Sequence, residues 1–147
     1  MDQSLKGKRY REVSFTLQRD RVTQFALATG QDDPIFLDAD AARAAGYADQ
    51  VAPPTFATVL QIMTSGQAVV DPELGLDYSR VVHGEQAYEF ARPLVVGDVL
   101  SAVPRIADVY AKGPNEFLIL EAEIHDAAGE LVCVSRSTLL SRGTARG

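Results

Sequence analysis

The loop at residues 29–38, TGQDDPIFLD, gathers side chains of the kind that carry out acid–base chemistry. Asp32, Asp33 and Asp38 stand close together, and carboxylates transfer protons when their surroundings tune the pKa. Asp is also a common turn residue and helix N-cap, so the same three residues fit a purely structural loop. Phe36 lies among them, and an aromatic hydrocarbon has no proton to exchange.

The two histidines of the chain are the other candidates for proton transfer, because His titrates nearest to neutral pH. His83, in VVHGEQ, begins an expected strand, and Glu85 follows two positions later, which predicts that both face the same side of that strand. His83 fits either a catalytic or ligand-facing group or a polar residue at the start of a strand. His125, in EIHDAAGE, fits a solvated residue at the end of a strand.

Composition and charge place the chain among ordinary globular domains. It has 147 residues, 46% of them hydrophobic and 23% charged, which suits one domain with one core. The net charge of -6 disfavours a nucleic-acid surface, which needs clustered cations. Single cations such as Arg80, Arg92 and Lys112 remain candidates for a phosphate-bearing ligand. Cys133 is the only cysteine, so no intrachain disulfide forms, and its alternating surroundings predict a small buried apolar residue.

The sequence predicts a cytoplasmic protein. No apolar run approaches the ~20 residues that cross a bilayer. The basic start, MDQSLKGKRYREV, is not followed by the apolar stretch of a signal peptide. No residue pattern points to a metal or to an organic cofactor.

Hydrophobic periodicity defines the expected elements. Helical spacing of apolar residues predicts three helices, and the run with Phe56, Val59, Leu60 and Met63 is the most apolar. Period-two alternation predicts five strands, four of them in the second half of the chain. The expected helices are 19–30, 39–46 and 50–67, and the expected strands are 10–17, 82–91, 98–111, 116–126 and 130–141.

Helix boundaries follow from capping residues. Asp20 and Asp38 are the expected N-caps of the first two helices, and Gly30 ends the first. Gly66 is expected to end the third, while Ala128-Gly129 marks a hairpin between the last two strands. Residues 1–7 and 143–147 are expected to be loose tails of a single domain.

This order of elements predicts an α+β fold in which one apolar helix packs against a curved antiparallel sheet of about five strands. The opposite face of that sheet receives no helix of its own. A domain of this kind often pairs with a second copy or with a relative.

Three segments of the chain resemble the MaoC-like (R)-specific hydratases and dehydratases, and more narrowly their N-terminal, FAS1-type dehydratase branch. They read FALATGQDDPIFLDADAARAAGYADQVAPPTF, VVHGEQAYEFARPLVVGDVLSAV and GELVCVSRSTLL, and the similarity extends over roughly residues 8 to 142. The resemblance implies a single hot-dog fold, a long central helix wrapped by an antiparallel sheet. It also implies hydration of trans-2-enoyl thioesters of CoA or acyl carrier protein, or the reverse dehydration, by paired hot dogs.

The catalytic pattern that this family uses is changed here at the positions that do the chemistry. The family's Asp falls on Gln31, its Asn on Asp33 and its His on Phe36, while Pro34 matches. The glycine whose N–H supports the developing enolate falls on Pro54, which has no N–H. Gln31 and Phe36 transfer no proton, so normal hydratase chemistry is not expected in this loop.

Three interpretations of the sequence remain open. The chain is a non-catalytic subunit that shapes an acyl pocket beside a catalytic hot dog, with Gln31, Phe36, Glu85, Pro54, Thr55 and Phe56 near the substrate. Alternatively it is a homodimeric hydratase with a relocated site, in which His83 works with Glu85 or Asp33. In the third interpretation it binds acyl thioesters without any reaction.

Overall fold

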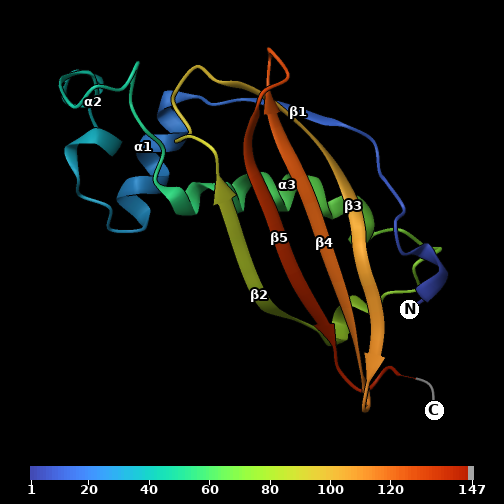
Figure 1. The fold of residues 1–147 in the computed structure, drawn as a ribbon. Coiled ribbons are helices and arrows are strands. Elements are labelled where there is room, and N and C mark those ends of the chain that lie inside the picture. Colours follow the sequence, from blue (N-terminus) through green and yellow to red (C-terminus); the bar gives the residue numbers. More distant parts are fainter. Residues whose placement is uncertain (146–147) are drawn as a thin grey trace.

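In the computed structural model, which describes residues 1–145, five antiparallel strands wrap around one central helix (Figure 1). The strands are β1 (Val13–Thr16), β2 (Val81–Phe90), β3 (Val99–Lys112), β4 (Asn115–Asp126) and β5 (Leu131–Ser141), in the order β1-β3-β4-β5-β2. The helices are α1 (Arg19–Ala28), α2 (Ala39–Ala44) and α3 (Ala57–Val69). Short 3-10 helices occupy Gln3–Leu5, Pro34–Phe36, Pro54–Phe56 and Tyr78–Arg80.

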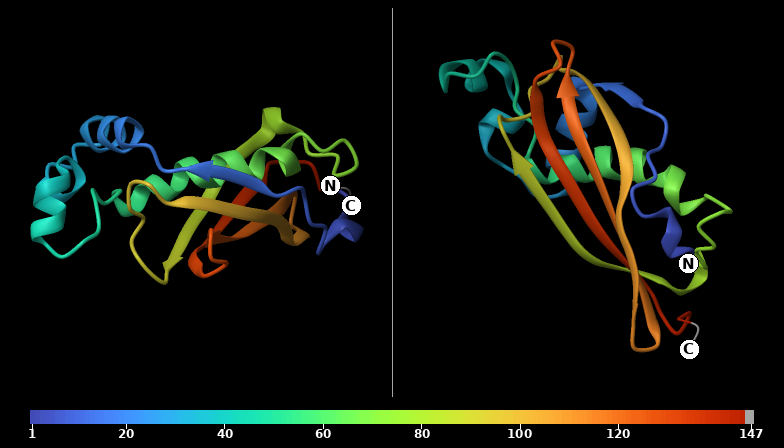
Figure 2. Two further views of the ribbon diagram at one scale, coloured as in Figure 1. Left: turned by 90° about the horizontal axis from the view of Figure 1, so that it is seen from above. Right: turned by 45° about the vertical axis from the view of Figure 1, so that its right-hand side comes forward.

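This is the hot-dog fold of class α+β that the sequence predicts. Helix α3 lies on one face of the curved sheet, and within residues 1–145 no helix covers the opposite face (Figure 2). Helices α1 and α2 form an arm that extends beyond the sheet at the end where α3 begins (Figures 1 and 2). Within the described residues no helix is long and apolar enough to span a membrane.

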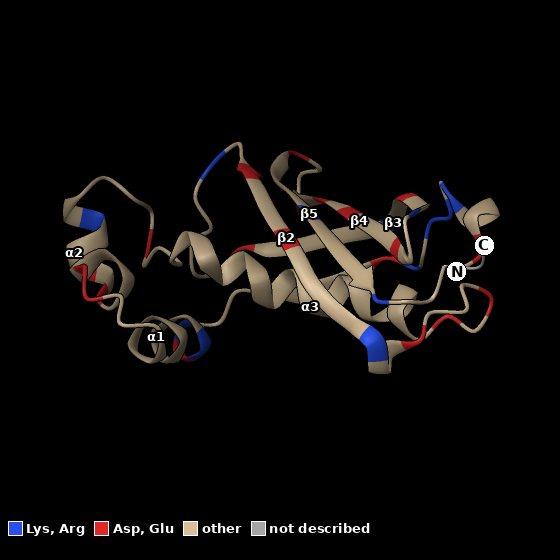
Figure 3. Ribbon diagram, turned by 90° about the horizontal axis from the view of Figure 1, so that it is seen from below, with Lys and Arg blue, Asp and Glu red and all other residues tan. Residues whose placement is uncertain are grey.

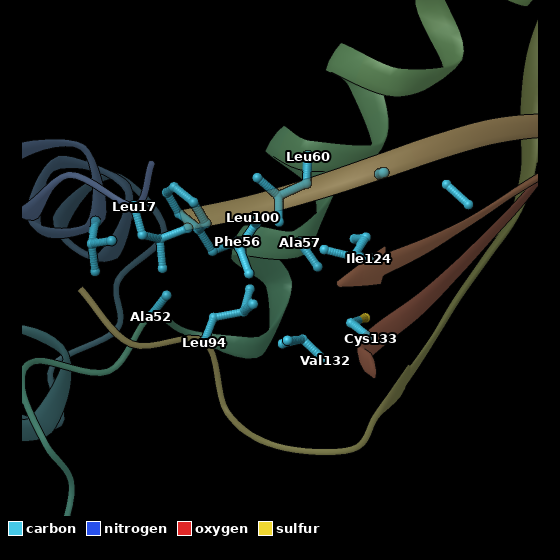
Figure 4. Close-up of a cluster of buried hydrophobic side chains, with 13 residues drawn as sticks. Leu17, Ala52, Phe56, Ala57, Leu60, Leu94, Leu100, Ile124, Val132 and Cys133 are labelled. Atoms are coloured by element: carbon cyan, nitrogen blue, oxygen red, sulfur yellow. The ribbon is translucent and has the colours of Figure 1, made fainter. Parts of the chain in front are cut away.

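The main core lies between the start of α3 and the concave face of the sheet (Figure 4). Phe56 is 3% exposed, and its ring meets Phe25 of α1 edge-on, with centroids 5.3 Å apart. Leu60 of α3 and Ile124 of β4 are buried beside it, together with Cys133, as expected for that residue. Burial raises the pKa of the Cys133 thiol to about 11. Phe56 is therefore part of the hydrophobic core.

Several of the expected helix boundaries are wrong, including the start of the third helix, which lies at Ala57 and not at Gln50. Helix α1 begins at Arg19 with Gln18 at the N-cap, and Asp20 lies in the first turn instead of capping it. Helix α3 passes through Gly66 and ends at Val69. A glycine inside a helix costs about 1 kcal/mol relative to alanine, but burial of Ala68 beyond it holds the last turn in place. The Asp38 cap is confirmed by the 2.7 Å bond that its carboxylate accepts from the Ala41 N–H.

The expected N-terminal tail is instead bound to the rest of the domain. The Gly7 N–H donates to the Ile106 carbonyl at 2.8 Å, which extends the edge of the sheet at β3. Lys8 forms ion pairs with Asp71 and Glu73, both in the loop after α3. At the other terminus the Ala145 N–H donates to the Pro114 carbonyl at 3.1 Å. The last part of the expected C-terminal tail, 146–147, lies outside the described residues.

Candidate functional site

The loop after α1 is held by its own main-chain turns. The Gln31 N–H donates to the Ala26 carbonyl at 2.9 Å and so completes the end of α1. The Asp33 carboxylate accepts from the Ile35 N–H at 3.1 Å, which makes Asp33 the cap of the 3-10 helix Pro34–Phe36. In this structure Asp33 is therefore engaged as a structural residue of the loop.

Phe36 and Pro54 come together at one apolar cleft of about 360 Å³, which lies where the arm meets the sheet. Its lining includes Tyr47 from the arm and Phe90 from the end of β2. The positions that the resemblance assigns to a proton carrier and to an oxyanion donor are thus walls of a hydrophobic cavity. We call this cavity the apolar cleft. Thr55 is exposed and follows Pro54 in the 3-10 helix that leads into α3.

The main chain at the start of α3 offers little to an oxyanion. Pro53 and Pro54 have no N–H, and the Phe56 N–H already donates to the Pro53 carbonyl at 2.7 Å. A hydratase would need a donor there for the charge that develops on the thioester oxygen. Pro54 therefore has no N–H to offer, and it begins the 3-10 helix that leads into α3.

Arg92 is the only charged side chain among the described residues that line the apolar cleft. Its guanidinium makes two bonds to Asp98, of 2.8 and 3.1 Å, and one of 3.2 Å to Asp126. The hydrogen bonds that Arg92 donates to Asp98 and Asp126 raise the pKa of Arg92 above its ordinary value. Its charge is neutralised within the protein, which weakens its case as a phosphate ligand.

His83 lies in a different cavity. A groove of about 320 Å³ runs between α3 and the strands β2 and β5, and His83 lines it together with Gln61, Gln86 and Ser137. We call this cavity the His83 groove. The Gln61 amide donates to the Ser137 hydroxyl at 2.9 Å and accepts from the Ser135 hydroxyl, so the groove has a polar floor.

His83 and Glu85 do not share a face of β2, so that expectation is wrong. The pairing of β2 with β5 shifts between these two residues: His83 pairs with Leu139, and Glu85 pairs with Thr138. His83 lines the groove, as does Leu139, whereas Glu85 accepts a 3.4 Å bond from the Thr138 hydroxyl. Gly84 is the extra residue of this bulge, and a Cβ there would stand 3.3 Å from the Thr138 carbonyl.

The structure therefore brings Phe36 and Pro54 together and leaves His83 apart from both Glu85 and Asp33. A hydrogen bond of 2.7 Å between the Thr58 and Tyr88 hydroxyls joins α3 to β2 near both cavities.

Sequence reasoning missed Gln50, Tyr47 and Phe90, which shape or support the apolar cleft. Phe90 was findable from the alternation of β2, but nothing local in the sequence marks Gln50. Over the described residues no cluster of three or more His, Cys, Asp or Glu side chains could hold a metal.

The fold and the two cavities define a hot-dog domain of the hydratase and dehydratase type. A model of the FAS1-like dehydratase domain region matches residues 4–135, and the chain belongs to this family. A UPF0336 protein of Saccharopolyspora erythraea is 44% identical over 146 residues, which cover 99% of this chain and 94% of that relative. Another, from Streptomyces avermitilis, is 39% identical over 148 residues, covering 100% of this chain and 99% of that one.

Solved structures agree with this assignment. The HadBC (3R)-hydroxyacyl-ACP dehydratase complex of Mycobacterium tuberculosis includes a chain with 28% identity and a TM-score of 0.81, covering 92% of this chain and 96% of that one. A MaoC-like dehydratase has a TM-score of 0.88 at 23% identity, and the match covers 95% of this chain but only 43% of that one. An (R)-hydratase from A. caviae has a TM-score of 0.72 at 20% identity, with 94% and 98% covered. The last two likenesses concern the fold.

Proposed function

We propose that this chain is the non-catalytic subunit of a dehydratase or hydratase built from two hot dogs, and that it shapes the acyl-binding cavity beside a catalytic partner. The substrate would be a 3-hydroxyacyl or trans-2-enoyl thioester of CoA or of acyl carrier protein. The observation that carries the proposal is the position of Phe36 and Pro54 in the walls of one apolar cleft.

The chemistry explains why a partner is needed. Hydration of an enoyl thioester takes a base to activate water, an acid to protonate the alpha carbon and a donor for the enolate oxygen. In this chain Gln31, Phe36 and Pro54 stand at those three positions, and none of them performs the step. A cavity with hydrophobic walls still contributes, because it buries the acyl chain and orients the thioester toward groups on another subunit.

The comparisons support a two-hot-dog assembly. The dehydratase from M. tuberculosis is by its description a complex of HadB and HadC, and a chain in it has the fold of this protein over almost its whole length. The MaoC-like dehydratase with the higher TM-score is more than twice as long as the part that matches this chain. Both cases fit a unit of this size working beside a second unit.

One side of the molecule has the properties of a subunit interface. β2 pairs with β5 along one edge, and no strand among the described residues pairs with its other edge. Beside it, Ile62 of α3 is 66% exposed and Tyr78 is 67% exposed. Helix α3 carries no charged residue, so Figure 3 shows it entirely in tan behind β2. A free strand edge next to exposed apolar side chains is a surface on which another strand can dock.

Co-expression with a MaoC-like chain that carries the Asp and His pair, from the same genome, tests the proposal. We expect a stable heteromeric complex that hydrates crotonyl-CoA or a longer enoyl-CoA, and no turnover by this chain alone. Replacing the partner's catalytic Asp should abolish the activity, whereas His83→Ala in this chain should not abolish it. Turnover by the isolated chain that His83→Ala removes would establish the relocated site instead. Acyl-CoA binding without turnover in any complex would establish a binding protein.

A further inference from the structure

Gln50 is a completely buried polar residue at the junction of the arm and the sheet. It is 0% exposed, and it belongs to neither cavity. A buried side-chain amide is costly unless its hydrogen-bonding groups are satisfied, so its partners show what it holds together.

The Gln50 amide nitrogen donates to two elements of the arm. One bond of 2.6 Å reaches the main-chain carbonyl of Phe36, and one of 2.9 Å reaches the Thr23 hydroxyl on α1. The Gln50 amide oxygen accepts from the Arg19 guanidinium at 3.1 Å. Both protons and the oxygen of this amide are therefore used, and only an amide offers this combination at this length.

The main chain around Gln50 holds the opposite wall of the apolar cleft. The Val96 N–H donates to the Gln50 carbonyl at 2.9 Å, and the Ala52 N–H donates to the Leu94 carbonyl at 2.8 Å. The Val51 N–H donates to the Ile35 carbonyl at 3.0 Å, next to Phe36. One short segment thus connects the loop of Phe36 to the segment of Leu94, and both line the cleft.

We propose that Gln50 is a positioning residue that fixes Phe36 in the wall of the apolar cleft and so sets the width of that cleft. What the cleft admits, an acyl chain, rests on the proposed function. The positioning itself rests on the hydrogen bonds of Gln50, and it can be measured without a partner or a reaction.

Gln50→Glu removes the hydrogen bond that positions Phe36 and leaves the volume of the buried side chain almost unchanged. The side chain keeps its size, but an ionised carboxylate has no proton to donate and would face the Phe36 carbonyl with a negative charge. Gln61→Glu is the matched control, since Gln61 is 5% exposed and hydrogen bonded, but lies in the His83 groove. Both substitutions lose hydrogen bonds of a buried amide, and only one of them releases Phe36.

The chain contains no tryptophan, so Phe36→Trp places a single fluorescent reporter in the cleft wall. In that background Gln50→Glu is expected to shift the emission to longer wavelength and to increase quenching by acrylamide, and Gln61→Glu is expected to change neither. In the chain without the reporter, hydrogen exchange at the Phe36 and Leu37 amides should accelerate about tenfold in Gln50→Glu alone, as loss of a buried hydrogen bond predicts. Unchanged exchange at these two amides, or equal acceleration in both variants, would overturn the proposal.

Titrating the Phe36→Trp chain with octanoyl-CoA tests acyl binding by the cleft separately from the positioning of residue 36 by Gln50. A change in emission on addition supports an acyl chain in the cleft. No change in emission counts against the acyl-binding role of the cleft, and the comparison of the Gln50 and Gln61 variants still decides whether Gln50 positions residue 36.

Discussion

At the scale of single residues, our proposal is that the loop after α1 keeps the scaffold of the family's proton-transfer loop without the groups that transfer the protons. Asp38 still caps α2, and Pro34 still begins the short helix that carries Phe36. The resemblance to the family marked Gln31, Phe36 and Pro54 in the sequence as the positions that differ from its catalytic pattern. That two of them line one cavity depends on how the arm folds against the start of α3, which local patterns do not encode.

Placing a histidine at position 36 is expected not to make the isolated chain a hydratase. Phe36→His supplies a proton carrier, but Gln31 is still no base and Pro54 still has no N–H for the oxyanion. The isolated variant should show crotonyl-CoA hydration no higher than the unaltered chain, measured by loss of the enoyl absorbance. Phe36→Tyr serves as the control for changes in folding. Clear turnover by Phe36→His would mean that the other two groups are supplied from elsewhere in the chain.

The Cys133 thiol is expected to be inert in the folded protein. It is 0% exposed, and burial raises its pKa to about 11, so the reactive thiolate is scarce at mildly alkaline pH. A colorimetric thiol reagent should titrate no cysteine in the native state and one per chain in denaturant. Rapid native labelling would show that the core around Cys133 opens easily.

At the scale of elements, period and turn chemistry predict the strands and helices, and tertiary packing sets the details. The alternation after Val81 defines four strands in the order observed. The period-two alternation of β2 did not indicate the bulge at Gly84. This bulge places Glu85 on the opposite face of the strand from His83. It depends on the close approach of two strands, which becomes visible only when β2 and β5 are paired. Gly66 was likewise predicted to end the helix. The helix continues past it, and Ala68 in the last turn is buried in the core.

The middle strands are joined by a buried carboxylate with a testable pH dependence. Glu121 of β4 lies between Arg105 of β3 and Arg136 of β5, whose Nε is 3.0 Å from it. Burial alone would raise the pKa of Glu121, but hydrogen bonds from Arg136 and Arg105 outweigh it and hold the pKa below the ordinary value of 4.5. Glu121 therefore stabilises the fold fully above that value, and the contribution is lost as pH falls through the lower folded pKa.

Glu121→Gln should remove that contribution. At neutral pH we expect about 1–2 kcal/mol less free energy of unfolding, because both arginines are partly exposed and regain water. The difference between variant and unaltered chain should shrink as pH falls below 4.5, and urea unfolding over a pH series measures it. A difference that grows on acidification would have the wrong sign for a lowered pKa.

At the scale of the whole molecule, the two cavities lie at different places around α3, and only one of them adjoins the free edge of β2. The apolar cleft lies at the start of α3, and the His83 groove lies along its side between α3 and β2. Exposed apolar side chains gather by the groove and the free edge, where Ile62 and Tyr78 line the opening. The sequence alone predicted a sheet with one uncovered face, of the kind that often pairs with a second copy or a relative. Only the strand order shows that β1 and β2 are the outer strands.

Ile62→Asp tests this surface as an interface. Because Ile62 is 66% exposed, the free energy of unfolding of the isolated chain should change by no more than about 0.5 kcal/mol. Affinity for a hot-dog partner that carries the catalytic Asp and His should fall about thirtyfold, because the loss of a central apolar contact costs about 2 kcal/mol. Val99→Asp is the matched control: Val99 is 51% exposed on β3, with β4 and β5 between it and β2. If both variants bind the partner equally well, the interface lies elsewhere. If Ile62→Asp alone releases the partner and turnover falls with it, the uncharged face of α3 is where the catalytic subunit docks.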